Sequence, residues 1–336
     1  MTDTGAVSSI AGVPTTLLVA PDSFKGTFTA AQVAGAIARG LQAGGWPVDL
    51  CPIADGGEGT MAALVTALGA DPRAASVTDP LGREIEAEFA IHGSEAFLET
   101  AAASGLHLVD ADERDPLAAT TAGTGELILA AIAAGAGTVH LGVGGSATTD
   151  GGAGAIKAIR RGGGLGDARL IVLCDVRTPF EDAARVFGPQ KGADERDVRR
   201  LTARLHALAR RLDRDPRGVP MTGAAGGLSG GLWAAFGAEL LSGASFVLDA
   251  VGFDARMRAA RAVVTGEGKL DQQSLVGKAV SEIATRARQA GVPCHAVVGT
   301  RQLDSMGMRV LDLEHVLEAS TLAEIEAAGR TLATLI

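Results

Sequence analysis

Apolar runs alternate with amphipathic stretches near the start of the chain. The apolar run at 16–20 predicts a buried strand, and the capping-box spacing of Thr29 and Gln32 predicts the start of a helix. A second apolar run at 48–53 predicts another strand, followed by a helix over 58–68. This order favours a parallel sheet with its ligand-binding loops at the carboxyl ends of the strands.

The period of the pattern changes in the middle of the chain. Short alternating runs between 74 and 101 predict antiparallel strands, with a turn at 79–82. An amphipathic helix is expected over 198–212, and the Gly-rich segment 223–231 should open a helix that continues through Leu241. The other elements expected here are a helix over 123–134 and strands over 138–143 and 170–174.

From residue 262 on, the pattern again predicts strands that alternate with helices. Thr321 and Glu324 have the spacing of another capping box, which predicts the start of a last helix. The other elements expected here are a strand over 262–265, a helix over 275–289, a strand over 295–298 and a short strand near Val316.

These patterns predict an α/β protein with two α/β domains. Residues 15–75 and 260–336 should form a discontinuous, Rossmann-like parallel-sheet domain. Residues 76–259 should form an inserted α/β domain with some antiparallel strands, and 1–14 a flexible tail. We expect the active site in the cleft between the domains. A chain of 336 residues is long enough to bury a core in each.

Composition excludes several classes of function. The formal charge of −9 argues against a nucleic-acid partner. The longest charge-free run, 127–149, contains Gly clusters and a Ser/Thr-rich half, so we expect a helix, a turn and a strand rather than a membrane span. No secretory signal pattern is present at the start, and the protein should be cytoplasmic.

The three cysteines are far apart in the sequence. Cys51, Cys174 and Cys294 each adjoin an apolar run, as is typical of small buried side chains in a reducing compartment. Because no Cys-x-x-Cys pair exists, a structural cysteine zinc site has no support.

The most informative stretch follows the expected strand at 138–143. Gly144 and Gly145 permit a close backbone approach to a ligand, and the amides that open the next helix suit an anion. The hydroxyls of Ser146 and Thr148 are candidate phosphate contacts or ordinary turn residues. Two roles are open for Asp150, which either holds a cation or caps the helix it precedes.

Two further stretches have the same form. Asp55, Gly56, Gly57 and Glu58 follow the strand at 48–53, so a second acidic, Gly-rich loop joins a strand to a helix. The segment Val263-Val264-Thr265-Gly266-Glu267-Gly268-Lys269-Leu270-Asp271 repeats the combination of strand end, glycines and carboxylates. Several such loops in one chain suggest a polyanion site.

With four other motifs, these stretches complete a pattern that resembles the type I family of bacterial glycerate kinases. The other motifs are Pro21-Asp22-Ser23-Phe24-Lys25-Gly26, Cys174-Asp175-Val176, Gly188-Pro189-Gln190-Lys191-Gly192 and Gly223-Ala224-Ala225-Gly226-Gly227. The resemblance runs from about Leu17 to the last expected helix. It implies transfer of the γ-phosphoryl group of ATP to a hydroxyl of D-glycerate, with the 2-hydroxyl favoured, in the presence of Mg²⁺. A homodimer is one of the oligomeric states left open.

Phosphoryl transfer needs charge neutralisation and alignment, which suggests a role for each motif. We expect Asp55 and Asp150 at the metal or phosphate site and either Asp22 or Asp175 as the base. Lysine occurs at just five positions, and the Gly-flanked Lys25 and Lys191 should be catalytic residues that face phosphate or substrate. The other expected binding residues are Ser23, Gly56, Gly57, Glu58, Gly144, Gly145, Ser146, Thr148, Gly226, Gly227 and Glu267.

The chain departs from the family pattern at one place. Family members carry a longer polar segment between the helix after the Gly-rich loop and the Cys-Asp-Val strand, whereas here 160–166 leads almost directly into 169–173. This shortening affects the expected rim of the cleft and the choice of acceptor. Two alternatives therefore stay open, a kinase for another small hydroxy acid and a non-catalytic protein that binds a sugar acid or nucleotide on the same scaffold.

Other enzyme classes lack their motifs. No Gly-x-x-x-x-Gly-Lys-Ser/Thr run is present, which argues against a P-loop enzyme, and no Gly-x-Gly-x-x-Gly, which argues against a dinucleotide dehydrogenase.

Overall fold

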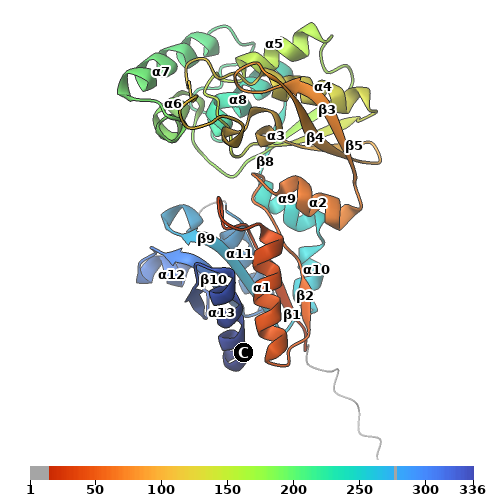
Figure 1. Ribbon diagram of the computed structural model, residues 1–336, viewed down its shortest axis with the longest axis vertical. Coiled ribbons are helices and arrows are strands. Elements are labelled where there is room, and N and C mark those ends of the chain that lie inside the picture. Colours follow the sequence, from red (N-terminus) through yellow and green to blue (C-terminus); the bar gives the residue numbers. More distant parts are fainter. Residues whose placement is uncertain (1–14, 276–277) are drawn as a thin grey trace, which may run out of the picture. The chain divides into compact units, whose positions relative to one another are not determined.

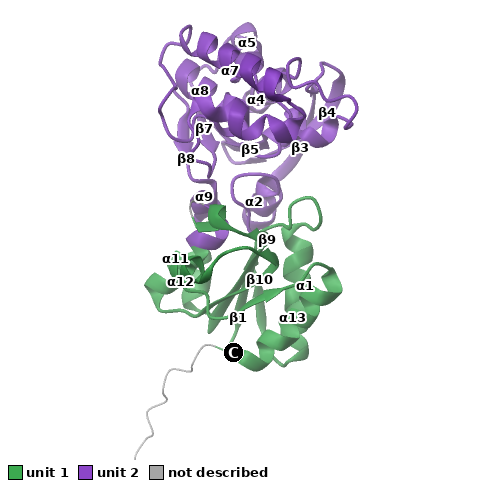
Figure 2. Ribbon diagram, turned by 90° about the vertical axis from the view of Figure 1, so that its left-hand side faces the viewer, with its two compact units in different colours: residues 1–52, 252–275, 283–336 green, residues 53–251, 276–282 purple. Residues whose placement is uncertain are grey.

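The computed structural model describes residues 15–275 and 278–336, so the tail expected over 1–14 lies outside the described residues. Two compact units divide the chain (Figure 2). Unit 1 comprises 15–52, 252–275 and 283–336, and unit 2 comprises 53–251 and 278–282.

Unit 1 contains a parallel sheet formed by both ends of the chain. The strand order is β11-β10-β9-β1-β2, and every neighbouring pair is parallel. Helix α11 begins with a turn that belongs to unit 2. The elements are β1 (Leu17–Pro21), α1 (Ala30–Ala43), β2 (Val48–Leu50), α10 (Phe253–Arg258), β9 (Ala262–Leu270), η4 (Gln272–Leu275), α11 (Ala279–Ala290), β10 (Cys294–Arg301), α12 (Ser305–Leu311), β11 (Val316–Glu318) and α13 (Leu322–Leu335).

Helices cover both faces of this sheet. Helices α1 and α13 lie on one face, and α11 and α12 lie on the other (Figure 2). Val33 and Ile37 of α1 pack with Leu17, Val264 and Ile325 in a core that excludes water. Burying such aliphatic side chains supplies most of the folding free energy of the unit.

The chain of unit 2 follows a different topology. Its sheet has the order β3-β4-β5-β6-β7-β8, in which β3, β4 and β5 are antiparallel neighbours and β5 to β8 are parallel. The helices are α2 (Thr60–Leu68), α3 (Thr100–Ser104), η1 (Leu106–Leu108), α4 (Ala122–Ala133), α5 (Ala153–Arg161), η2 (Phe180–Asp182), α6 (Ala183–Phe187), η3 (Pro189–Lys191), α7 (Glu195–Ala209), α8 (Ala224–Phe236) and α9 (Gly243–Ala250). The strands are β3 (Asp71–Thr78), β4 (Glu84–His92), β5 (Glu95–Glu99), β6 (Thr138–Gly142), β7 (Arg169–Leu173) and β8 (Glu239–Leu241).

The large core of unit 2 lies between this sheet and α4, α5 and α8 (Figure 1). Leu127 and Ile128 of α4, Ile159 of α5 and Leu228 of α8 are buried there. A smaller core on α2 joins Leu64 to Phe97 of β5. The fold is therefore mixed α/β with one parallel and one mixed sheet, as the sequence predicts.

The unit boundaries and the end of one helix differ from the expectations. Residues 252–259 lie in unit 1 and residues 278–282 in unit 2, each in the other unit than expected. Residues 53–75, which we expected in the first domain, belong to unit 2, because Leu64 of α2 packs on Phe97. The helix expected through Leu241 ends at Phe236, because Gly237 adopts a left-handed φ of 68° and ends it. Leu241 then lies in β8.

Within the described parts of the chain, no helix is both long and apolar enough to span a bilayer. The charge-free run at 127–149 falls into α4, a turn, β6 and the loop after β6, in agreement with the expected helix, turn and strand. The three cysteines are buried free thiols, as expected.

Candidate active site

Two glycine-rich loops of unit 2 meet backbone to backbone. A Cβ on Gly144, in the loop after β6, would lie 2.6 Å from the Cα of Gly57. A Cβ on Gly142, at the end of β6, would lie 2.8 Å from the carbonyl oxygen of Gly56. Because any side chain at these positions would collide with backbone atoms, the glycines allow the loops of Asp55 and of Ser146 to converge. Two motifs far apart in the sequence therefore form one cluster.

A third loop brings Asp175 to this cluster. A Cβ on Gly243, at the start of α9, would lie 2.5 Å from the carbonyl oxygen of Asp55. Asp175 accepts hydrogen bonds from Ser242 Oγ at 2.9 Å, from the amide of Gly243 at 2.9 Å and from the amide of Ala244 at 3.0 Å. Asp175 thus anchors the amino end of α9 beside Asp55.

Burial and the neighbouring charge act together on Asp175. The pKa of Asp175 is raised to about 7. Desolvation is the largest cause, the hydrogen bond from Ser242 lowers the pKa, and the negative charge of Asp55 raises it. Asp55 is only 8% exposed, and its Oδ1 accepts a hydrogen bond from the amide of Gly57 at 3.1 Å. A pair of neighbouring carboxylates, of which Asp55 is buried and Asp175 half-buried, can bind a cation or exchange a proton near neutral pH.

Glu99 is a further carboxylate near these loops, which the sequence analysis did not single out. It ends β5, and its Oε1 accepts a hydrogen bond from the amide of Met61 at 2.8 Å, in the first turn of α2. Burial raises the pKa of Glu99 to about 7, and the charge of Glu58 adds to this. The available signal was its position at the carboxyl end of a strand, the same position that singled out the other acids.

Asp150 serves the structure of its loop. Its carboxylate accepts hydrogen bonds from the amide and hydroxyl of Thr121 and from the amides of Gly152 and Gly154, in the first turn of α5. The N-cap of α5 is Gly152, and Asp150 accepts from the first-turn amide of Gly154; a cation at Asp150 stays a prediction. With so many donors satisfied, a metal ion at Asp150 would have to displace hydrogen bonds.

Lys191 donates hydrogen bonds to the loop after β6. This side chain is only 3% exposed, and its Nζ donates to Ser146 Oγ at 3.0 Å and to the carbonyl oxygen of Thr148. Burial lowers the pKa of Lys191 to about 7, against the opposing effect of Asp150. The hydroxyl oxygens of Thr148 and Thr149 are buried in the same loop without a hydrogen-bond partner among the described residues. Lys191 therefore places an ionisable amine in a loop that also has two hydroxyl groups available for hydrogen bonding.

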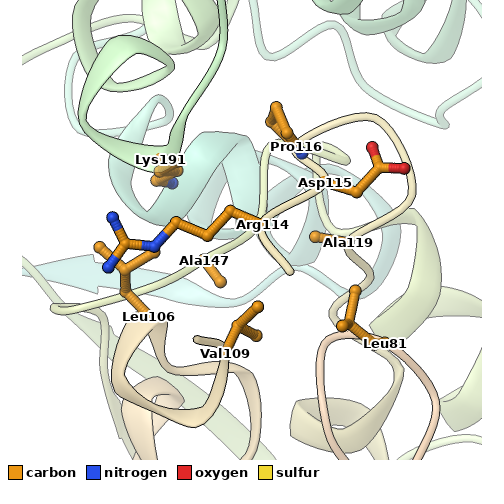
Figure 3. Close-up of a pocket in the computed structure, with 9 residues that line it drawn as sticks. All are labelled: Leu81, Leu106, Val109, Arg114, Asp115, Pro116, Ala119, Ala147 and Lys191. Carbon is orange, nitrogen blue, oxygen red and sulfur yellow. The ribbon is translucent and has the colours of Figure 1, made fainter. Parts of the chain in front are cut away.

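A small pocket lies next to Lys191 (Figure 3). It encloses about 10 Å³, which is room for one water-sized group. Figure 3 shows Lys191 and the guanidinium group of Arg114 on the same side, with the carboxylate of Asp115 on the other. The remaining lining is mostly apolar and comes from Leu81, Leu106, Val109, Pro116, Ala119 and Ala147. The guanidinium group of Arg114 and the ionisable amine of Lys191 beside an apolar wall suit a small anionic group.

Gly226 and Gly227 lie within the packing of the same unit. Both have left-handed φ angles, and a Cβ on Gly226 would lie 2.0 Å from the carbonyl oxygen of Thr148. A Cβ on Gly227 would lie 2.9 Å from the ring of Phe180. These contacts explain why glycine is needed at both positions. That Gly226 and Gly227 contact phosphate stays a prediction.

Four of the predicted site residues lie in unit 1, at the carboxyl edge of its sheet. Asp22 follows β1, and its amide donates to the carbonyl oxygen of Gly266 at 2.8 Å, next to Glu267 on β9. Asp22 and Glu267 are buried, Ser23 is half-buried, and Lys25 is exposed. The amide of Ser23 donates to Asp22 Oδ1 at 2.6 Å. The loop after β1 thus presents a lysine beside two buried acids.

Known proteins are similar to most of this chain in sequence. The profile of the glycerate kinase family matches residues 17–161 and 160–331, two stretches that meet where the sequence analysis found a shortened segment. A glycerate kinase of Halalkalibacterium halodurans is 39% identical, with 85% of each chain covered. A glycerate 2-kinase of Escherichia coli K12 is also 39% identical, over 84% of this chain and 85% of its own.

A solved structure agrees with these relatives. The crystal structure of a Salmonella typhimurium LT2 protein assigned as glycerate kinase 2 superposes with a TM-score of 0.78 at 33% identity. The match covers 95% of this chain and 97% of that one. With both the sequence and the fold matched over this length, the chain belongs to the glycerate kinase family.

Proposed function

We propose that the protein transfers the γ-phosphoryl group of ATP to the 2-hydroxyl of D-glycerate and releases ADP. The relatives named glycerate kinase and glycerate 2-kinase support the acceptor and its position. The observation that carries the proposal is the pair of buried Asp55 and half-buried Asp175, brought together where the start of α9 at Gly243 meets the loop of Asp55. A protein that only binds a sugar acid has no need of two neighbouring carboxylates whose negative charges repel each other.

The donor set around Asp55 fits Mg²⁺. Asp55 and Asp175 offer carboxylate oxygens, the ligands that this ion prefers, and their mutual repulsion would be relieved by a cation. When bound, the ion would neutralise charge on the transferred phosphate. We propose Asp55 as its principal protein ligand, and we assign Asp150 to holding the loop and α5 in place.

The reaction also needs a proton acceptor. The 2-hydroxyl oxygen forms a bond to the γ-phosphorus, the bond from that phosphorus to the β,γ-bridging oxygen breaks, and the hydroxyl proton passes to a carboxylate. We propose Asp175 as this base, because three donors fix its carboxylate beside Asp55 and its pKa in the metal-free protein is about 7. Asp22, which the sequence offered equally, is the alternative in unit 1.

The pocket beside Lys191 supplies a place for the acceptor's own carboxylate. Its size admits one small group rather than a nucleoside. Arg114 brings a fixed cation to it, and Lys191 adds an amine whose pKa burial lowers to about 7. We propose that this pocket orients glycerate by its carboxylate. In unit 1, the exposed Lys25 beside Asp22 and Glu267 is proposed to contact nucleotide phosphate.

An ADP-release assay with candidate acceptors tests the proposal. D-Glycerate should be turned over with ATP and Mg²⁺ much faster than L-glycerate, D-lactate or L-serine, and ³¹P NMR should identify the product as 2-phosphoglycerate. Fast turnover of D-lactate alone would favour the alternative of another hydroxy acid kinase. Absence of turnover with every acceptor, combined with retained ATP binding, would favour the non-catalytic alternative.

A further inference from the structure

Two histidines and a glutamate meet where β10 and β11 begin. The pairing of these strands extends back beyond β11, since the amide of Ala296 donates to the carbonyl oxygen of His315 at 2.9 Å. This pairing sets the rings of His295 and His315 side by side, stacked with centroids 5.2 Å apart and planes 10° apart. Glu314 Oε2 lies 3.8 Å from His295 Nε2. One ligand atom from each of these three side chains lies within 4.8 Å of the others.

His295 is an unusual member of this cluster. It is 1% exposed, and neither Nδ1 nor Nε2 has a hydrogen-bond partner among the residues the structure describes. Buried polar groups are nearly always satisfied, so two unsatisfied nitrogens on one buried ring require an explanation. Neutral imidazole is the form that ligates metals.

We propose that His295, Glu314 and His315 bind one divalent transition-metal ion, of the class of Zn²⁺, Co²⁺ or Ni²⁺. Two imidazole nitrogens and one carboxylate oxygen suit these ions, whereas Mg²⁺ prefers a set made only of oxygens. His295 and Glu314 also line a surface hollow with Arg258, Arg261 and Ile336, which gives an ion a way in and leaves room for water as a further ligand. The bound ion would satisfy a nitrogen of the buried ring.

The position of the cluster indicates a structural role. His295 and His315 lie at the amino ends of their strands, whereas Asp22 and Glu267 lie toward the carboxyl ends of β1 and β9 in the same parallel sheet. The edge strand β11 has only 3 residues. An ion held by residues of both strands would fasten β11 to β10 and stabilise the folded state by mass action. The proposal is independent of the phosphoryl-transfer chemistry.

Metal titration of the untagged, EDTA-treated full-length protein tests this site. Added Co²⁺ should give visible d–d absorption that saturates at one ion per chain, and Zn²⁺ should displace it and raise the melting temperature. His315→Ala and Glu314→Gln should each weaken Co²⁺ binding, with a loss of at least about 10-fold for Glu314→Gln and about 100-fold for His315→Ala. His92→Ala, which removes an exposed histidine of unit 2, is the matched control and should bind as the wild type does.

Two results would overturn the proposal. One is the absence of d–d absorption at millimolar Co²⁺, and the other is unchanged affinity in folded His315→Ala. Circular dichroism establishes that each variant is folded. If a variant does not fold, ¹⁵N NMR of the wild-type histidine rings decides: Zn²⁺ should shift the nitrogens of His295 and His315. Shifts confined to the other histidines would place the metal elsewhere and contradict the assignment.

Discussion

Asp175 illustrates how one residue can combine two functions. Three donors from the start of α9 hold its carboxylate in a single orientation, and burial next to Asp55 raises its pKa. The donors alone would stabilise the ionised form and lower the pKa, so the raised value shows that burial and charge repulsion dominate. The same contacts that position the proposed base therefore leave it able to accept a proton.

Removing one of these donors should move the titration of Asp175 in a known direction. Ser242 stabilises the ionised carboxylate, so Ser242→Ala should raise the pKa of Asp175 above about 7, by about one pH unit. Carboxyl ¹³C NMR of the metal-free protein measures this pKa directly. Because the base must be ionised, the rising limb of kcat/KM should move to higher pH as well.

Ser94→Ala is the control for this substitution, since Ser94 is exposed in the turn between β4 and β5. It should leave both profiles unchanged. A fall in the pKa of Asp175 in Ser242→Ala, or a shift of the NMR titration with no shift of the kinetic limb, would contradict the assignment of the base.

Arg114 allows the proposed acceptor pocket to be tested without disturbing a buried group. Its side chain is exposed at the pocket, so Arg114→Met should leave the fold intact while removing one cation from the pocket. We expect the KM for D-glycerate to rise by about 10-fold or more, as for the loss of a charge-assisted hydrogen bond, with the KM for ATP nearly unchanged. Steady-state kinetics with each substrate varied in turn measure both constants.

Arg196→Met removes an exposed arginine of α7 and should alter neither constant. An equal rise in both KM values for Arg114→Met would indicate a general disturbance instead. An unchanged KM for glycerate would remove the pocket from the site.

At the scale of elements, the convergence of loops depends on glycine. Gly144→Ala would place a Cβ 2.6 Å from Gly57 Cα and 3.2 Å from the amide nitrogen of Glu58, so one loop must move. We expect a loss of about 1–3 kcal/mol in the free energy of unfolding, measured by urea denaturation, together with reduced turnover. Gly137→Ala is the matched control, because its nearest neighbour would be 3.9 Å away. Equal stability of the two variants would show that the close approach is unimportant.

Elements with strong local signals could be predicted from the sequence. Both capping boxes, at Thr29 and at Thr321, form as expected, because each depends on residues three apart. The antiparallel strand β4 follows from the alternation at 85–89, and the strand at 138–143 follows from its β-branched residues. Local chemistry is sufficient in these cases.

Elements set by tertiary packing could not be predicted. Helix α2 has a short apolar pattern that fits either domain, and only its packing on Phe97 places it in unit 2. The end of α8 was missed because Gly237 is one of several glycines in that segment, and nothing in the sequence shows which one adopts a left-handed φ.

The site was predictable in part for the same reason. Acids after strands could be found from the sequence, which is why Asp55 and Asp175 were expected there. The division of roles could not, because it depends on donors distant in the sequence, such as Thr121 for Asp150 and Ser242 for Asp175. The burial of Lys191 was also not visible from its Gly-flanked loop.

At the scale of the whole molecule, the chain retains the family's motifs while one connection is short. The link from α5 to β7 spans only residues 162–168, and the family profile breaks at 160–161. None of the carboxylates of the proposed site lies in this link. We therefore expect the shortening to affect acceptor preference rather than phosphoryl transfer itself.

The turnover number of Asp55→Asn tests the central claim most directly. Asparagine keeps an oxygen that can accept the hydrogen bond from Gly57 but removes the charge, so the fold should survive. The account predicts that kcat with ATP, Mg²⁺ and D-glycerate falls by about 100-fold or more, with an unchanged circular dichroism spectrum, while exposed Asp110→Asn behaves as the wild type. Wild-type turnover in folded Asp55→Asn would contradict the account.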